Sequence, residues 1–212
     1  NTYGTLNLLK AAVKAKVRRF IYISANSAAG SQRDRRTLIS EDDLPHPYMH
    51  YGRSKLLAEK AVQSFFDSGQ LETVILRPFW FYGPGQPDRQ TTLFRMIHKG
   101  NPWLFGDGNN LRSMTYIDSL IQAILLAETS PAATGQLFFI ADKNPYTTLE
   151  IYNVVAEHLG IQLRPRHLPA LLSGLSELTD KFIQTLRQYS MYIHVAGEMT
   201  KNIGCVPEKA ER

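Results

Sequence analysis

A tyrosine and a lysine stand four residues apart in the segment YGRSK, which runs from Tyr51 to Lys55. Apolar residues recur with helical spacing across residues 51–66, so both side chains are expected to project from one helix face. A nearby ammonium favours the phenolate form of a tyrosine. Such a tyrosine can take a proton from an alcohol, or return one to a carbonyl, while hydride moves to or from a nicotinamide. Because a Tyr and a Lys at a fixed spacing also arise by chance, the pair needs support from its surroundings.

The segments around this pair predict an α/β fold. Residues 20–23 and 73–76 are short apolar runs rich in β-formers, as in strands buried on both faces of a parallel sheet. Residues 5–15 have the apolar spacing of a helix, as do residues 51–66. Strand, helix and strand in this order favour a right-handed parallel crossover. Residues 27–44 are polar and predict a loop.

The second half of the chain is mixed in character. An aromatic cluster at residues 79–82 runs into the turn Gly83-Pro84-Gly85. We predict a strand over residues 136–141 and helices over residues 93–99, 118–128, 149–159 and 168–189. Asp118 and Thr148 are the expected N-caps of the second and third of these helices.

Composition excludes several classes of protein. Of 212 residues, 43% are hydrophobic and 20% charged, which suits a folded domain rather than a disordered chain. No apolar run reaches the roughly 18 residues that span a bilayer, so we expect no membrane span. The single cysteine, Cys205, excludes an internal disulfide framework and a cysteine-rich metal site; no metal site is predicted, and a cytoplasmic location is the default. A net charge of +5, without a basic stripe interleaved with aromatics, favours a phosphate-bearing ligand over nucleic acid.

Five motifs give the Tyr–Lys pair its context. In chain order they are NTYGTLNLL (residues 1–9), FIYISANSAAG (20–30), YGRSKLLAE (51–59), LRPFWFYGPG (76–85) and RSMTYID (112–118). Together they resemble the extended short-chain dehydrogenase/reductase superfamily and, within it, the NAD-dependent epimerase/dehydratase family. The resemblance covers most of the chain.

This resemblance implies a fold and a set of roles. The fold is a Rossmann-like, doubly wound parallel sheet with a smaller mixed α/β substrate lobe. Tyr51 would be the general acid/base, and Lys55 would hold the nicotinamide ribose of NAD or NADP. The remaining implied positions are Asn1, Ser24 and Ser27 in the catalytic group, Ser24, Pro78 and Phe81 at the cofactor, and Ala25, Asn26, Trp80 and Arg112 at the substrate.

Two of these assignments have plain structural alternatives. Arg112 falls where sugar-nucleotide members of the family place an arginine on the substrate diphosphate, a task that suits a bidentate guanidinium. It could equally be a solvated hairpin arginine. Phe79, Trp80 and Phe81 could line a substrate pocket or belong to the core.

The sequence departs from the family pattern after the first strand. The family usually has Ser-Ser or Ser-Thr there, and the second hydroxyl polarises the substrate oxygen. Here Ser24 is followed by Ala25, so a methyl group replaces that hydroxyl. Ser27 is the favoured substitute donor and Ser24 a poorer one, while Ser27 as a simple turn residue is the alternative. Losing one such donor commonly lowers the rate by about 10²–10³.

The glycine motif that holds a dinucleotide pyrophosphate is absent. A family member would need roughly another 90–100 residues before Asn1 to form its first mononucleotide-binding half, so we expect the chain to be a fragment that lacks this half. The ending, residues 203–212, resembles the family's C-terminal segment cut short. Residues 1–82 would then be the second half of the cofactor-binding domain. Residues 83–212 would be mainly the substrate lobe, with residues 117–141 returning to the first domain.

The leading functional hypothesis is an NAD(P)-dependent epimerase or dehydratase that acts on a nucleotide sugar. An NAD(P)-dependent alcohol dehydrogenase, such as one of 3β-hydroxysteroid dehydrogenase type, is the alternative, because the aromatic residues 79–81 also suit an apolar substrate. A catalytically weakened nucleotide-binding regulator is a third possibility, raised by Ala25. A small-molecule substrate is expected in each case, and a homodimer is possible by analogy with relatives that pair through the Tyr-bearing helix. Whether NAD or NADP is used stays open, because the residue that reads the ribose would lie upstream.

Overall fold

Three parallel strands form the central sheet of the computed structural model, which describes residues 1–31, 37–186 and 188–211. The strands β1 (Arg19–Ile23), β2 (Glu72–Pro78) and β7 (Leu137–Ile140) lie in the order β1-β2-β7. Tyr22 is opposite Ile75, and Leu76 is opposite Phe138. The predicted parallel α/β fold is confirmed.

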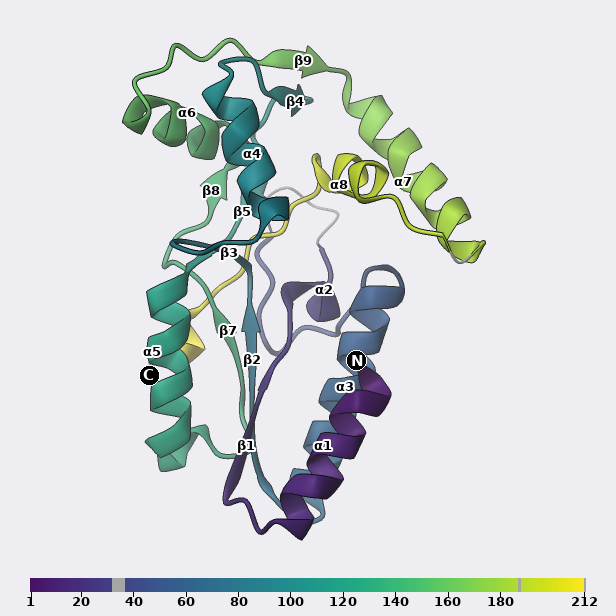
Figure 1. Ribbon diagram of the computed structural model, residues 1–212, viewed down its shortest axis with the longest axis vertical. Coiled ribbons are helices and arrows are strands. Elements are labelled where there is room, and N and C mark those ends of the chain that lie inside the picture. Colours follow the sequence, from purple (N-terminus) through teal and green to yellow (C-terminus); the bar gives the residue numbers. More distant parts are fainter. Residues whose placement is uncertain (32–36, 187, 212) are drawn as a thin grey trace.

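Helices cover both faces of this sheet, so the sheet is sandwiched between two helical layers (Figure 1). On one face lie α1 (Thr2–Lys14) and α3 (Met49–Asp67), which bury Leu9 and Val62 against the sheet residue Ile75. On the other face lies α5 (Ile117–Thr129), whose Leu120 packs with Leu76. Each such fully buried aliphatic side chain contributes roughly 1.5–3 kcal/mol to folding, so the apolar strand runs require both helical layers.

A second group of elements lies beyond the carboxyl ends of β1 and β2 (Figure 1). Its helices are α4 (Asp88–His98), α6 (Thr148–His158), α7 (Ala170–Thr185) and α8 (Met191–Glu198). Short two-stranded pairings join β3 (Trp80–Tyr82) to β6 (Met114–Tyr116), β4 (Trp103–Phe105) to β9 (Arg166–Leu168), and β5 (Leu111–Arg112) to β8 (Tyr146–Thr147). The chain returns from this group to the sheet through α5 and β7. The division of the chain at residue 82 stays a prediction.

Several expected boundaries are wrong, for local reasons. The N-cap of α6 is Thr147, because its hydroxyl accepts from the Glu150 amide at 3.1 Å while the Glu150 carboxylate accepts from the Thr147 amide at 2.7 Å. Helix α5 begins at Ile117 with Tyr116 as its cap, so Asp118 lies inside the first turn. The helix expected over residues 168–189 ends at Thr185, and α8 was not predicted.

The expected loop over residues 27–44 also contains regular structure. Helix α2 (Asn26–Ala29) forms directly after β1, and Ile39 makes a parallel bridge with Cys205. Residues 32–36 of that loop lie outside the described residues. Two 3-10 turns, η1 (Pro131–Ala133) and η2 (Glu208–Glu211), complete the described elements.

A buried ion pair ties α3 to the sheet. Glu59 accepts from both Nε and Nη2 of Arg77, at 2.8 and 2.6 Å, and also from the Ser24 hydroxyl. Glu59 and Arg77 are only 3% and 4% exposed. By its helical spacing Glu59 lies off the face formed by Leu56, Leu57, Ala61, Val62 and Phe65. The tertiary structure instead buries it beside the ends of β1 and β2.

Glycine at position 52 lets α2 approach α3. A Cβ atom at Gly52 would lie 2.3 Å from the Ser27 carbonyl oxygen, closer than any real contact. The Tyr48 amide donates to this same oxygen at 3.1 Å. The short segment after β1 therefore packs directly on the first turn of α3, which carries Tyr51.

We expect Glu59→Ala to lower the free energy of unfolding by about 3–5 kcal/mol, because it leaves the Arg77 guanidinium buried without its partner. Arg95→Ala is the matched control, since it removes an exposed ion pair with Asp88 and is expected to cost less than about 1 kcal/mol. Chemical denaturation of both variants measures the two values. Equal, small losses would contradict a structural role for the buried pair.

We expect Gly52→Ala to destabilise the fold by about 1–3 kcal/mol, because the added methyl group forces α2 away from α3. At Gly4, in α1, an added Cβ meets no atom within 4 Å. Gly4→Ala is therefore expected to be stabilising, by about 0.5–1 kcal/mol, through helix propensity alone. Thermal or denaturant unfolding distinguishes the two alanines, and similar effects would overturn the close-approach argument.

Candidate active site

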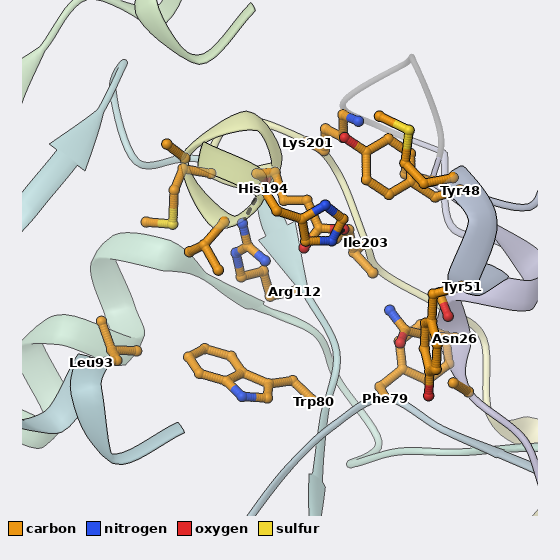
Figure 2. A pocket seen from close by; sticks show the side chains of 18 of the residues that line it. Asn26, Tyr48, Tyr51, Phe79, Trp80, Leu93, Arg112, His194, Lys201 and Ile203 are labelled. Atoms are coloured by element: carbon orange, nitrogen blue, oxygen red, sulfur yellow. Dashed lines mark hydrogen bonds and ion pairs between the residues drawn. The ribbon is translucent and has the colours of Figure 1, made fainter. Parts of the chain in front are cut away.

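A cavity of about 1320 Å³ opens where the carboxyl ends of β1 and β2 meet the second group of elements (Figure 2). The sheet side contributes residues that follow β1 and β2 and those of the first turn of α3. The opposite side is formed by α4, α6, α8 and the end of α7. In parallel α/β sheets, ligands bind outside the carboxyl ends of the strands, so this cavity is the candidate active site.

Tyr51 lies at the edge of this cavity, in the first turn of α3, with its side chain half exposed. Lys55 follows one turn later, and its ammonium donates to the Ile23 carbonyl at 2.8 Å. The same ammonium lies 4.8 Å from the centre of the Tyr22 ring. Burial lowers the pKa of Lys55, and the nearby Glu59 carboxylate partly opposes that shift. Helix α3 thus brings both members of the pair to the end of β1.

Asn1 is attached to the same helix. Its amide donates to the Ser54 hydroxyl at 3.0 Å, and that hydroxyl donates to the Tyr51 carbonyl at 2.8 Å. The start of α1 therefore lies beside the turn of α3 that carries Tyr51. The structure places Asn1 next to the Tyr–Lys pair without showing a catalytic part for it.

The two serines after β1 differ in their surroundings. The Ser24 hydroxyl donates a hydrogen bond to the buried Glu59 carboxylate. The Ser27 hydroxyl is buried and, among the described residues, has no hydrogen-bond partner. Both residues line the cavity with Ala25 and Asn26 between them. The tertiary structure therefore leaves hydrogen-bonding capacity at Ser27 and not at Ser24.

The aromatic residues after β2 divide between wall and core. Pro78, which ends β2, and Phe81 and Trp80, which lie in β3, all border the cavity. Phe79 also borders it but is 2% exposed and packs edge-to-face on Phe139, with ring centres 5.3 Å apart. The alternatives of pocket and core are therefore both partly right for this cluster.

Arg112 reaches the cavity from β5, on the side opposite the sheet (Figure 2). Its Nε donates to the Thr148 hydroxyl at 3.2 Å and its Nη2 to the Glu198 carbonyl at 2.8 Å. No described residue accepts a hydrogen bond from its Nη1 atom. Burial lowers the pKa of Arg112, although the guanidinium stays charged in any ordinary buffer. A partly buried cation at a cavity wall is not a solvated hairpin arginine.

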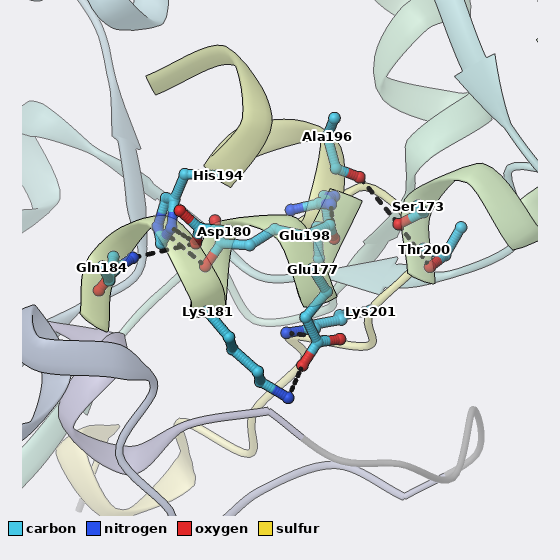
Figure 3. A network of polar contacts seen from close by, with 11 residues as sticks. Ser173, Glu177, Asp180, Lys181, Gln184, His194, Ala196, Glu198, Thr200 and Lys201 are labelled. Atoms are coloured by element: carbon cyan, nitrogen blue, oxygen red, sulfur yellow. Dashed lines mark hydrogen bonds and ion pairs between the residues drawn. The ribbon is translucent and has the colours of Figure 1, made fainter. Parts of the chain in front are cut away.

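Sequence reasoning missed a polar cluster at the cavity, which α7, α8, the residues after α8 and the start of α3 form together. Tyr48, His194, Glu198 and Lys201 all border it, and Asp180 lies directly behind His194 (Figures 2 and 3). The Lys201 ammonium lies 3.5 Å from the centre of the Tyr48 ring. Burial raises the pKa of Tyr48, and the carboxylates of Glu198, Glu177 and Asp180 raise it further. The residues are far apart in sequence and belong to no motif, so only the fold brings them together.

Two further observations bear on the class of site. Within the described residues, no group of three or more His, Cys, Asp or Glu side chains could hold a metal ion. Across the same part of the chain, no helix is both long and apolar enough to cross a membrane.

Comparison with known proteins gives the cavity its context. Residues 1–141 match the model of the NAD dependent epimerase/dehydratase family. An uncharacterised protein of Sinorhizobium fredii is 41% identical over 100% of this chain and 62% of its own length. A UDP-glucose 4-epimerase of Vibrio cholerae is 32% identical over 88% of this chain and 60% of its own length. The chain thus spans about three fifths of the length of these two relatives.

A solved structure agrees with these relatives. UDP-glucuronic acid 4-epimerase of Bacillus cereus, in complex with UDP-glucuronic acid and NAD, superposes with a TM-score of 0.68 at 30% identity, covering 80% of this chain and 54% of the epimerase. The segment that matches the family model includes the parallel sheet, both helical layers and the helix that carries Tyr51 and Lys55. On its fold, its motifs and these matches, the chain belongs to the NAD-dependent epimerase/dehydratase family.

Proposed function

We propose that the protein containing this chain is an NAD(P)-dependent epimerase or dehydratase of nucleotide sugars, with Tyr51 as its general acid/base. One observation carries the proposal. Tyr51 and the Arg112 guanidinium lie on opposite sides of one cavity at the carboxyl ends of parallel strands, and Lys55 lies one turn behind Tyr51 with its ammonium on the Ile23 carbonyl. A sugar hydroxyl can then lie at the tyrosine while the diphosphate lies at the arginine.

The residues on the sheet side fit the nicotinamide end of the cofactor. Lys55 has three N–H donors and uses one of them on the Ile23 carbonyl, which leaves donors for ribose hydroxyls. Pro78 and Phe81 offer apolar surfaces on the wall of the cavity that Tyr51 also borders. Bound NAD(P) would supply a hydride acceptor and donor in this place.

The chain's own residues would handle the protons and orient the sugar. Tyr51 would take a proton from the sugar hydroxyl as it is oxidised and return it when the carbonyl is reduced. Arg112 would hold the diphosphate through its remaining N–H groups and so place the sugar against the tyrosine. We infer that Ser27, rather than Ser24, supplies the hydroxyl that position 25 lacks, because its hydrogen-bonding capacity is unused among the described residues.

A second candidate keeps the fold and changes the substrate. Apolar side chains border much of the cavity, among them Trp80, Leu93, Met96, Ile151 and Leu168. This lining also suits a sterol-like alcohol, and the protein would then be a net dehydrogenase. Accumulation of reduced cofactor separates the two functions, since a dehydrogenase releases it and an epimerase consumes it within each cycle.

A non-catalytic, nucleotide-binding relative is the third candidate. Only the missing hydroxyl at Ala25 favours it, and the Tyr51–Lys55 pair argues for catalysis. Pairing of two copies through α1 and α3 is a further proposal, supported by the apolar side chains that these helices expose, notably Leu8 and Leu57.

We expect Tyr51→Phe to lower turnover by about 10²–10⁴-fold while leaving cofactor and substrate affinity nearly unchanged, because only the transferable proton is removed. The assay uses protein from the complete coding sequence, NAD or NADP, and a panel of UDP- and dTDP-sugars analysed by chromatography. Tyr3→Phe, an exposed tyrosine of α1, is the matched control and is expected to be fully active. Wild-type rates in Tyr51→Phe would show that another group moves the proton.

We expect Ala25→Ser to raise the turnover number by about tenfold or more, because a hydroxyl stabilises the developing charge on the substrate oxygen. Combining it with Ser27→Ala separates the two donors. If Ser27 is the present donor, Ser27→Ala lowers the rate in the parent and has little effect in the Ala25→Ser background. If Ser27→Ala leaves the rate of the parent enzyme unchanged, Ser27 is not the hydroxyl donor. If Ala25→Ser is inactive but still binds its ligands, the result favours the regulator.

A further inference from the structure

Helices α7 and α8 pack against each other and bring an aspartate and a histidine together. Asp180 Oδ2 lies 2.7 Å from His194 Nδ1, and the Gln184 amide donates to the same oxygen at 3.0 Å (Figure 3). Asp180 is fully buried, and the His194 side chain is 12% exposed. Both residues lie outside the segment 1–141 that matches the family model.

This contact determines which nitrogen of His194 faces the ligand space. A carboxylate only accepts hydrogen bonds, so Nδ1 carries the proton and donates it to Asp180. In the neutral imidazole, Nε2 is then an acceptor. Nε2 lies 3.7 Å from Glu198 Oε1, which is longer than a hydrogen bond. Among the described residues, Nε2 therefore has no hydrogen-bond partner, and both His194 and Glu198 border the cavity.

The fold holds this imidazole in place from several directions. The Tyr48 ring lies 5.3 Å and the Tyr189 ring 5.5 Å from it, centre to centre. Asp180 Oδ1 is buried without a hydrogen-bond partner among the described residues, so the aspartate carries a free-energy cost at this position. Such a locally unfavourable arrangement at a cavity wall is typical of a functional position.

Glu198 links this pair to the arginine already described. Its backbone carbonyl accepts from Arg112 at 2.8 Å, while its carboxylate lies beside His194. Glu198 therefore contacts Arg112 through its backbone and lies near His194 through its side chain, and all three residues border the cavity. Two neighbouring acceptors bind hydroxyl donors, and the Glu198 carboxylate repels a second anionic group.

We propose that His194 and Glu198 are specificity-determining residues that accept hydrogen bonds from hydroxyl groups of the substrate's sugar, with Asp180 as the positioning residue of His194. The inference rests on the proposed function and deepens it, because it specifies a substrate with several hydroxyl groups on its ring. A sterol-like alcohol offers no group of hydroxyls at this wall.

The test measures the affinity of holoenzyme for one nucleotide sugar, for example UDP-glucose, and for analogues that each lack one hydroxyl. His194→Phe keeps an aromatic ring between Tyr48 and Tyr189 and removes both nitrogens. Glu198→Met keeps the approximate length of the side chain, removes both acceptor oxygens, and serves if the first variant does not fold. His158→Phe is the matched control, because His158 is an exposed histidine of α6 whose Nδ1 contacts the Val154 carbonyl.

In the wild type and in His158→Phe, we expect at least one missing hydroxyl to weaken binding roughly tenfold. In His194→Phe or Glu198→Met, the parent sugar itself binds about tenfold more weakly, and the same missing hydroxyl makes little further difference. An unchanged penalty for every analogue in both variants would overturn the inference. If wild-type holoenzyme neither binds nor converts nucleotide sugars, the proposed function itself fails, which is a different result from normal turnover with unaltered discrimination.

Discussion

The buried pair of Glu59 and Arg77 is the interaction on which the candidate active site depends. Glu59 belongs to α3 and Arg77 to the end of β2, and the same carboxylate holds the Ser24 hydroxyl at the end of β1. Two charges so deeply buried are tolerated only with full mutual hydrogen bonding, so helix and strands have one compatible arrangement. Tyr51 and Lys55 lie at the N-terminal end of the helix that this pair anchors.

The cavity then joins two surfaces with different tasks. The sheet side carries the groups suited to proton transfer and to a nicotinamide. The opposite side carries Arg112 and the polar residues of α7 and α8. Arg112 links α8 to β5 through the Glu198 carbonyl, so a change in how α7 and α8 pack would move the arginine's partners as well. Under the proposed function, chemistry and substrate choice would depend on separate parts of the chain, as is common when function is built on a widely used fold.

The elements with strong local signals were predicted well. The apolar runs that became β1 and β2 and the helical spacing of α1, α3 and α5 require no knowledge of distant contacts. Predictions failed where a distant partner overrides local character. The local sequence does not show that Glu59 is buried, because its partner Arg77 lies in a separate strand. Helix α8 is short and has no strong hydrophobic periodicity of its own. The spacing of Thr147 and Glu150 in the sequence is that of a capping box, so the cap at Thr147 rather than Thr148 could have been predicted.

The sequence by itself determined the fold class, the family and the helix that carries Tyr51 and Lys55, because motifs and hydrophobic periodicity act over a few residues at a time. Only the tertiary structure decided which hydroxyl after β1 keeps unused hydrogen-bonding capacity. It alone also showed that Arg112 is drawn into a cavity wall and that Asp180 fixes the imidazole of His194. The physical reason is that burial and hydrogen-bond partnership are properties of pairs far apart in the chain, such as Ser24 with Glu59, and no local pattern encodes them.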